Sequence, residues 1–356
     1  MPLGACAFGR AIDAYGKPLD GGPPLCGRSV ALELRLPQPH ERDPIAFPLW
    51  TGVRAIDALL TIGKGARLGI FGAPGVGKTS LLESIVGTCD ADAIVVALVG
   101  ERGREAQRWI ERRDDRTTVI CATSDRSAVE RLQAANVAFA QAGALRDRGL
   151  HVLVVLDSLA RVAMALREIA VAAGESAGRG GYPPRVFAQL ARLVEFAGSL
   201  HGGAITLIAT VIHDGDERDP VSEAARSLLD GHISLSPRLA QAGRFPAVDV
   251  VASTSRTMEA IVDGYHMRAA ATVRAALAAL DRIEDARAVG VQPSDPLSLA
   301  AIALEQRLDD FLRQGSSASA YPQTCALLGE LARQLDSQIG NPTISERPQS
   351  AGMIQS

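Results

Sequence analysis

The sequence has few aromatic residues and no excess of charge of either sign. Aromatic side chains make up 4% of its 356 residues, and 37 basic residues are balanced by 40 acidic ones, which leaves a net charge of −3. This balance gives the whole molecule no electrostatic field that attracts nucleic acid or an anionic membrane surface. No apolar run approaches the roughly 18 residues that a membrane-spanning helix needs. We therefore expect no nucleic-acid partner and no membrane span.

Cysteine and asparagine are also scarce. No two of the five cysteines have C-x-x-C spacing, and their number is odd. This pattern argues against the usual structural zinc sites and against a disulfide framework, and it favours a reducing compartment. The sequence shows no secretory signal peptide, and neither asparagine, Asn136 or Asn341, opens a glycosylation sequon. These absences together predict a cytoplasmic protein.

Hydrophobic residues, in contrast, make up 47% of the chain, enough for a substantial core. Short apolar runs typical of buried strands occur at 67–71, 93–99, 117–121, 151–156 and 204–211. Segments with helical character lie between them, at 80–86, 105–113, 128–147, 159–173 and 185–200. Strands that alternate with longer helices are typical of a mostly parallel sheet covered on both faces. The sequence therefore predicts an α/β fold.

The composition divides the chain into four parts. Residues 1–50 are rich in glycine and proline, which predicts an extended lead-in segment packed on the core. Residues 51–262 hold the α/β region and begin with a short helix. From residue 263 to residue 338 the apolar spacing is helical, which predicts a small C-terminal helical domain. Residues 339–356 are polar and contain proline, and we expect them to be disordered.

Three helices are predicted in the C-terminal region. One apolar face is shared by Val273, Ala276, Leu277 and Leu280, a second by Leu304, Leu308, Phe311 and Leu312. A third helix is predicted at 323–335. We expect Gly315 to end the second helix in the left-handed conformation. Glu305 and Asp309 lie one turn apart, and we expect them on the outer face, where partner proteins would bind.

One stretch, GAPGVGKT, matches the phosphate-binding loop G-x-x-x-x-G-K-[ST]. Its glycines let backbone N–H groups turn toward a phosphate without a Cβ in the way. Lys78 would place a cation against the β- and γ-phosphates, and the Thr79 hydroxyl is a hard oxygen ligand suited to Mg²⁺. A helix begins directly afterwards, and its N-terminus favours an anion. The predicted nucleotide-binding residues are Gly72, Ala73, Pro74, Gly75, Val76, Gly77, Lys78, Thr79 and Ser80.

Two carboxylates follow predicted strands, at the edge where a parallel sheet binds its ligand. Asp157 ends the strand at 151–156, where P-loop enzymes present their second magnesium-side group, and the phosphate loop favours this role over that of a helix cap. Glu101 follows the strand at 93–99 and could polarise the water that attacks the γ-phosphate. Taken alone, Glu101 would be a solvated residue in a charged turn. The guanine-reading motif N-K-x-D is absent from the sequence, which favours ATP over GTP.

Further downstream, the sequence resembles a known family. PAVDVVASTS at 246–255 resembles the ten-residue signature of the ATP synthase α/β subunit superfamily, and GERGRE at 100–105 agrees with it. DSLARVAMALREIAVAAGE and GGYPPRVFAQLARLVEFAG, within 156–198, closely resemble the export ATPases of type III secretion systems and bacterial flagella. LLDGHISL at 228–235 fits as well. The resemblance extends over nearly the whole chain.

This resemblance implies a RecA-like nucleotide domain in a homohexameric ring, with ATP and Mg²⁺ at each subunit interface. It implies that Glu101 is the catalytic base, with Arg102 beside it, and that Asp157 is the Walker B acid. Phe245 stands where the family places an aromatic ring against adenine. Arg256 stands where it places the arginine finger, which reaches the γ-phosphate of the neighbouring subunit. Taken alone, Phe245 would be a core residue and Arg256 a surface charge.

The implied activity is ATP hydrolysis that energises type III protein secretion, by releasing chaperones and unfolding the cargo. The implied partners are chaperone–effector complexes and the stalk and regulator proteins of an export apparatus at the cytoplasmic face of the inner membrane. A flagellar export ATPase remains an alternative, and an ATP synthase catalytic subunit is less favoured because 158–198 departs from that branch. A hexameric nucleic-acid motor would need a basic, aromatic-bearing binding domain. A regulatory paralogue without hydrolysis would not need intact Lys78, Glu101, Asp157 and Arg256.

The sequence also departs from the family in places. Arg185, Ala191 and Pro237 replace residues that the family usually has as Ser, Pro and Arg. Family members carry an N-terminal β-barrel of roughly a hundred residues, the size of a small domain, and this sequence begins just after the barrel would end. We therefore expect weakened ring assembly. The acidic loop at 213–219 matches the family's own acidic loop and is not predicted to bind a metal.

Overall fold

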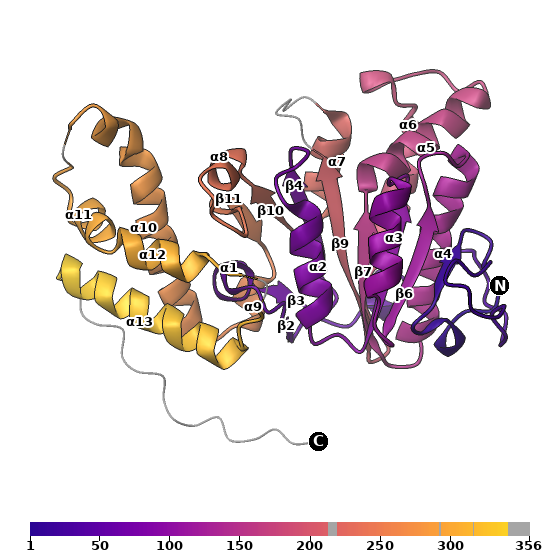
Figure 1. Cartoon of the computed structure of the whole chain (residues 1–356), viewed down its shortest axis with the longest axis horizontal. Coiled ribbons are helices and arrows are strands. Elements are labelled where there is room, and N and C mark those ends of the chain that lie inside the picture. Colours follow the sequence, from indigo (N-terminus) through magenta and orange to yellow (C-terminus); the bar gives the residue numbers. More distant parts are fainter. Residues whose placement is uncertain (213–218, 292, 316, 341–356) are drawn as a thin grey trace.

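The computed structural model describes residues 1–212, 219–291, 293–315 and 317–340. Figure 1 shows a layered α/β region with the N-terminus at one end, and a group of helices from α10 (Gly264–Ala288) to α13 (Tyr321–Ile339) at the other. The acidic loop and the predicted tail lie almost entirely outside the described residues. Within the described part of the chain, no helix combines the length and the apolar character that crossing a membrane requires.

The core of the molecule is a mostly parallel sheet. The strands are, in chain order, β1 (Ala11–Asp13), β2 (Pro48–Leu49), β3 (Ile62–Gly63), β4 (Arg67–Gly72), β5 (Ala93–Val99), β6 (Thr117–Ala122), β7 (His151–Asp157), β8 (Gly198–Leu200), β9 (Gly203–Ile212), β10 (Gly231–Leu235) and β11 (Val248–Ser255). Among the described residues, nine of them form one sheet in the order β1-β6-β5-β7-β9-β4-β10-β11, with β8 paired to β9. Neighbours along this order from β1 to β10 pair in parallel. β11 pairs antiparallel with β10, and β8 pairs antiparallel with β9. The predicted α/β fold with a mostly parallel sheet is confirmed.

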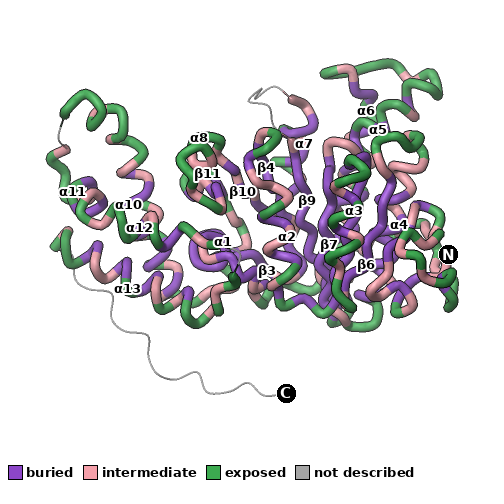
Figure 2. Tube along the Cα trace, viewed as in Figure 1, coloured by how far each residue is buried: buried purple, intermediate pink, exposed green. Residues whose placement is uncertain are grey.

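The five apolar runs of the sequence are the central strands β4, β5, β6, β7 and β9. β5 shows why, since all seven of its residues are buried. Ile94, Val96 and Leu98 pack on one face of the sheet, and Val95 and Val99 pack on the other. Side chains alternate between the two faces of a strand, and helices cover both faces here (Figure 2). A strand buried on both faces therefore has an apolar residue at every position.

Four strands of this sheet, β1, β8, β10 and β11, were not predicted as strands. β10 alternates buried and half-buried residues, and β1 and β8 have only three residues each. β11 pairs with β10 at both ends but has a bulge between them. Short, alternating or bulged strands give a weak apolar signal, because one face or one edge remains exposed to solvent.

The helices cover both faces of the sheet and form the C-terminal region. They are α1 (Arg54–Leu59), α2 (Lys78–Thr88), α3 (Gly103–Arg112), α4 (Ala128–Arg146), α5 (Leu159–Ala172), α6 (Pro184–Glu195), α7 (Pro220–Leu228), α8 (Pro237–Gln241), α9 (Met258–Ile261), α10, α11 (Pro296–Ala303), α12 (Glu305–Leu312) and α13. The helix predicted at 185–200 is too long, because α6 ends at Glu195 and β8 follows. Gly198 has φ 136°, a backbone conformation that no helix contains.

The C-terminal region differs from the prediction at both ends of the second helix. That helix is α12, which begins at Glu305, so Leu304 lies at its N-cap, directly after α11, and not within the helix. Gly315 does not end α12 in the left-handed conformation; Arg313, with extended backbone, follows its last residue. The apolar residues Leu308, Phe311 and Leu312 are nevertheless buried, as their spacing indicates. Hydrophobic periodicity thus identified the buried side of the helix but not its ends.

The first 50 residues run over the edge of the sheet and contain only short elements, the 3₁₀ turns at Ala5–Ala7 and Pro39–Glu41 and the strands β1 and β2. β1 extends the sheet by pairing in parallel with β6. Arg10, directly before β1, forms an ion pair with Asp20 at 2.8 Å, and the Asp20 side chain is almost fully buried.

Candidate active site

The phosphate loop connects β4 to the N-terminus of α2. Gly77 precedes α2 with φ 98°, in the left-handed region that favours glycine. A Cβ on Gly72 would lie 2.8 Å from the Val76 side chain, so the start of the loop also requires glycine. Lys78 Nζ donates to the carbonyl oxygens of Gly72 and Ala73, at 2.7 Å each. Lys78 is thereby held across the mouth of the loop, with Thr79 and Ser80 in the first turn of the helix.

The two candidate carboxylates lie at the same edge of the sheet as this loop. β5, β7, β9 and β4 are consecutive neighbours and parallel, so their carboxyl ends are adjacent. Glu101 follows β5, Asp157 ends β7, and Gly72 ends β4. Asp157 is buried, and its Oδ1 accepts a hydrogen bond of 2.5 Å from Thr210 Oγ1 on β9. The structure therefore brings together the phosphate loop and both carboxylates that the sequence singled out.

Burial determines the electrostatics of these carboxylates. Burial, and then the negative charge of Asp157, raise the pKa of Glu101 to about 8. The guanidinium of Arg161 opposes this shift, with its Nε 3.0 Å from Glu101 Oε1. Burial also raises the pKa of Asp157, against the hydrogen bond from Thr210. Two carboxylates held close in a buried site favour a cation between or beside them.

The chemistry of these side chains fits Mg²⁺ and a nucleoside triphosphate. Among the described residues, no three His, Cys, Asp or Glu side chains are grouped so that they could hold a metal ion alone. Mg²⁺ usually keeps several waters and binds through one or two carboxylates together with substrate phosphates. The Thr79 hydroxyl and the Asp157 carboxylate are donors of that kind, beside a loop that suits phosphate. The site would therefore hold the metal together with its nucleotide.

A cavity of about 480 Å³ opens beside the loop, and Phe245 lies in its wall. The Phe245 side chain is 50% exposed, and its ring would lie 3.9 Å from a Cβ on Gly77. A half-exposed aromatic ring next to a phosphate loop is not a core residue and offers a flat face to a base. The remaining wall includes Val53 from the start of α1 and Gln314 and Gly315 from the C-terminal region.

Arg256 and Arg102 do not join this cluster. Arg256 directly follows β11, and its backbone N–H donates to the carbonyl oxygen of Asp230, which lies beside Arg67 at the start of β4. The phosphate loop begins at the other end of β4, six residues or roughly 20 Å along the strand. The exposed Arg256 side chain is thus at the opposite edge of the sheet from the loop of its own chain. Arg102 is exposed and precedes the first turn of α3.

The sequence reasoning missed several residues that contact or shape the site. Thr210 and Arg161 fix the two carboxylates, and Gln314 and Gly315 close the cavity. Thr210 had a usable signal, because it is a polar residue near the end of an apolar strand. Gln314 and Gly315 had none, since only the folded chain brings the C-terminal region next to the phosphate loop.

A protein-family model described as the ATP synthase alpha/beta family, nucleotide-binding domain, matches residues 52–255. The chain belongs to the ATP synthase alpha/beta family. The match includes the phosphate loop, both carboxylates and the strand that precedes Arg256.

Individual members of the family cover most of the chain. It is 44% identical over 338 residues to a type 3 secretion system ATPase of Xanthomonas euvesicatoria, and the alignment covers 92% of this chain and 76% of the relative. It is 47% identical over 326 residues to a flagellum-specific ATP synthase of Salmonella typhimurium, and the alignment covers 88% of this chain and 72% of the relative.

Solved structures give the same picture. The assembled ATPase EscN from the type III secretion system of enteropathogenic E. coli matches with a TM-score of 0.88 and 38% identity, over 93% of this chain and 83% of that chain. EscN in complex with its central stalk EscO matches with a TM-score of 0.86 and 38% identity, over 93% of this chain and 82% of that chain.

These matches confirm the predicted resemblance, the fold class with its C-terminal helical region, and the enzyme class of a P-loop ATPase. ATP is accordingly the nucleotide that this ATPase family member uses. The roles of individual residues and of Mg²⁺ remain predictions.

Proposed function

We propose that this ATPase energises type III protein export, as one subunit of a homohexameric ring whose sites lie between subunits. The position of Arg256 carries the shared-site part of this proposal. The length of β4 separates Arg256 from the phosphate loop of its own chain, so Arg256 cannot complete that site. A neighbouring copy can supply it, as arginine fingers are supplied in trans to other P-loop enzymes.

In this proposal, each residue of the site has one task. The backbone of Gly72 to Ser80 and the Lys78 ammonium bind the phosphates. Thr79 and Asp157 would hold Mg²⁺, Asp157 directly or through water, and the ion would supply positive charge beside the phosphates. Glu101, oriented by Arg161, accepts a proton from the attacking water. Arg102, which is exposed and lies outside the cluster, adds positive charge at the margin of the site, and Phe245 stacks on adenine.

The export role rests on the relatives, whose names are those of secretion and flagellar ATPases. We assign chaperone–effector complexes, a central stalk and regulator proteins as partners, bound at the cytoplasmic face of the inner membrane. We also keep the division of the chain into a lead-in segment at 1–50, a RecA-like domain at 51–262, a helical domain at 263–338 and a tail at 339–356.

Flagellar export is the second candidate, and a specific observation favours it. The flagellum-specific relative of Salmonella shares 47% of aligned residues with this chain, slightly more than the Xanthomonas secretion ATPase at 44%. Expression of the chain in strains that lack either ATPase separates the two roles. Restored effector secretion supports the first role, and restored motility supports the second.

Mixing two inactive variants tests the shared site. Lys78→Ala removes the phosphate-binding cation, and Arg256→Ala removes the finger. We expect each variant alone to be inactive and a mixture to recover part of the ATPase activity, because some interfaces then combine an intact loop with an intact finger. The control mixture combines Lys78→Ala with Arg238→Ala, a change at an exposed arginine of α8, in place of Arg256→Ala. A mixture with Arg256→Ala that stays inactive while the subunits demonstrably associate contradicts the proposal.

A further inference from the structure

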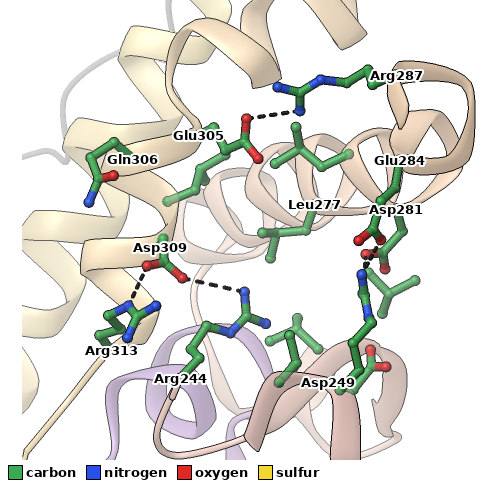
Figure 3. Close-up of a pocket in the computed structure, with 16 residues that line it drawn as sticks. Arg244, Asp249, Leu277, Asp281, Glu284, Arg287, Glu305, Gln306, Asp309 and Arg313 are labelled. Carbon is green, nitrogen blue, oxygen red and sulfur yellow. Dashed lines mark hydrogen bonds and ion pairs between the residues drawn. The ribbon is translucent and has the colours of Figure 1, made fainter. Parts of the chain in front are cut away.

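A second cavity, of about 370 Å³, lies between β11 and the helices α10 and α12 (Figure 3). Many of the side chains that line it are charged, and dashed lines in Figure 3 mark the ion pairs among them. Glu305 of α12 pairs with Arg287 of α10 at 2.9 Å. One turn further, Asp309 lies between two arginines, Arg244 and Arg313. This placement corrects our expectation that Asp309 lies on the outer face of the helical region.

Asp309 connects two segments that are far apart in the sequence. Its Oδ1 lies 3.8 Å from Arg244 Nη1, and its Oδ2 accepts a hydrogen bond from Arg313 Nε. Arg313 in turn donates through Nη1 to the carbonyl oxygen of Gly243, at 2.8 Å. The backbone N–H of Gln314 donates to the carbonyl oxygen of Phe245, at 2.9 Å. The segment that carries Phe245 is thus tied to the end of α12 at three successive residues.

The end of α12, which holds the Phe245 segment, is itself fixed to the α/β region. Gln314 Nε2 donates to the carbonyl oxygen of Gly52 at 2.6 Å, and Gln314 Oε1 accepts from the backbone N–H of Arg54 at 2.8 Å. Phe245, in contrast, is half-exposed, and the space around a Cβ on Gly243 is open. The backbone N–H groups of Gly243 and Arg244 donate to carbonyl oxygens of α8 on one side of the segment. The contacts with Asp309, Arg313 and Gln314 tie it to α12 on the other side, and packing adds little at the exposed Phe245 ring.

We propose that Asp309 is a positioning residue for nucleotide binding, which holds Phe245 in place against the phosphate loop. The proposal rests on the proposed role of Phe245 as the base-binding ring. The Asp309 side chain is 26% exposed and that of Arg244 is 18% exposed, so solvent screens this cluster less than a surface ion pair. Replacing the carboxylate by an amide keeps the size of the side chain but removes the charge that both arginines share. The Phe245 segment then loses one of its ties to α12.

The test compares Asp309→Asn with Glu305→Gln. Both changes remove one negative charge from the same helix and the same cavity, but Glu305 has no contact with the Phe245 segment. We expect Asp309→Asn to raise the KM for ATP about fivefold, the loss expected for a partly shielded ion pair, with kcat within about twofold. Glu305→Gln should leave both constants unchanged.

Two further measurements separate positioning from a general loss of structure. Inorganic tripolyphosphate has no base, so its inhibition constant should be the same for Asp309→Asn and the wild type. In a Phe245→Ala background, Asp309→Asn should add nothing to the KM, because the ring that it positions is gone. Arg244→Gln, which removes a partner of Asp309, should repeat the KM effect and provides a second variant if Asp309→Asn folds poorly.

The outcomes distinguish this inference from the proposed function. If Phe245→Ala leaves the KM for ATP unchanged, the proposed base site is wrong and the inference falls with it. If Phe245→Ala raises the KM but Asp309→Asn and Arg244→Gln do not, only the inference is overturned. Weaker tripolyphosphate inhibition, equal to the loss for ATP, also overturns it, because Asp309 would then support the whole site.

Discussion

Glu101 occupies an unusual position for a carboxylate, because it is buried between a negative and a positive neighbour. Asp157 raises the pKa of Glu101 and Arg161 lowers it, with burial as the larger cause of the net increase to about 8. A carboxylate with a raised pKa is a stronger base, provided that it is deprotonated when the nucleotide and metal are bound. This balance of charges is typical of catalytic acids and bases.

We predict that Glu101→Gln retains less than about a tenth of the wild-type ATPase rate but binds ATP normally, because an amide of equal size cannot accept the proton. Steady-state hydrolysis and binding of a fluorescent ATP analogue measure the two properties. Glu111→Gln, on the exposed side of α3, is the matched control and should be fully active. A substantial rate in Glu101→Gln would assign the base to another residue.

His151 illustrates how a single buried group can make stability depend on pH. Burial, and then the positive charge of Lys64, lower the pKa of His151 from 6.5 to about 4. Above pH 6.5 the ring is neutral in both the folded and the unfolded chain, and its contribution to stability is fully present. Between pH 6.5 and 4 only the unfolded chain binds the proton, so the free energy of unfolding falls as the pH falls.

We therefore expect wild-type protein to lose about 2 kcal/mol more stability than His151→Gln between pH 7 and pH 5. The glutamine cannot become protonated but can still bond to Thr206, which lies 2.8 Å from His151 Nε2. Urea unfolding at the two pH values measures the difference. Equal losses in both proteins would show that His151 does not titrate in this range.

At the scale of elements, β5 links the core to the catalytic edge. All its residues are buried, and Glu101 lies two residues beyond its end. We predict that Leu98→Ala destabilises the protein by about 2–5 kcal/mol, the usual loss for a large buried side chain in a core that cannot collapse. Val129→Ala, at a side chain that is 60% exposed on α4, should cost little. Denaturant unfolding of the two variants provides the comparison, and similar losses would contradict the assignment of β5 to the core.

The elements also show what the sequence could and could not predict. β5 and β7 were predictable because burial on both faces leaves an unbroken apolar run. β11 was not predicted as a strand, although its residues resembled a family signature, because three of its eight residues are exposed and it contains a bulge. The ends of α12 were not predicted, since Leu304 continues the apolar spacing ahead of the helix and Gly315 lies beyond its last residue. Apolar spacing shows which side of α12 is buried, but it gave no indication that Asp309 faces β11.

In the candidate site, too, only residues with a local sequence signal could be predicted. Lys78, Thr79, Glu101 and Asp157 could be predicted because each is tied to a strand end or to the loop motif. Residues that reach the site from another part of the fold had no local signal, as Gln314 shows. Phe245 and Arg256 came from the family resemblance alone, and their placement at the two ends of β11 was visible only in the structure.

At the scale of the whole molecule, a site that needs a second subunit makes activity depend on protein concentration. An arginine finger contributes roughly 10³ to 10⁵ in rate. We predict that specific ATPase activity rises with the concentration of this chain, as more interfaces form, and that Arg256→Ala flattens the rise. Light scattering and ATPase assays on one dilution series measure assembly and rate together. Constant specific activity in a protein that light scattering shows to be monomeric would contradict a finger supplied in trans.

The strand β11 has a consequence for communication around the proposed ring. Phe245 precedes it and Arg256 follows it, and both ends of the strand are paired with β10. One end would sense whether the subunit's own nucleotide is present, while the other would present a cation to the nucleotide next door. A movement of β11 together with β10 would therefore change the position of Phe245 in one pocket and that of Arg256 in the next.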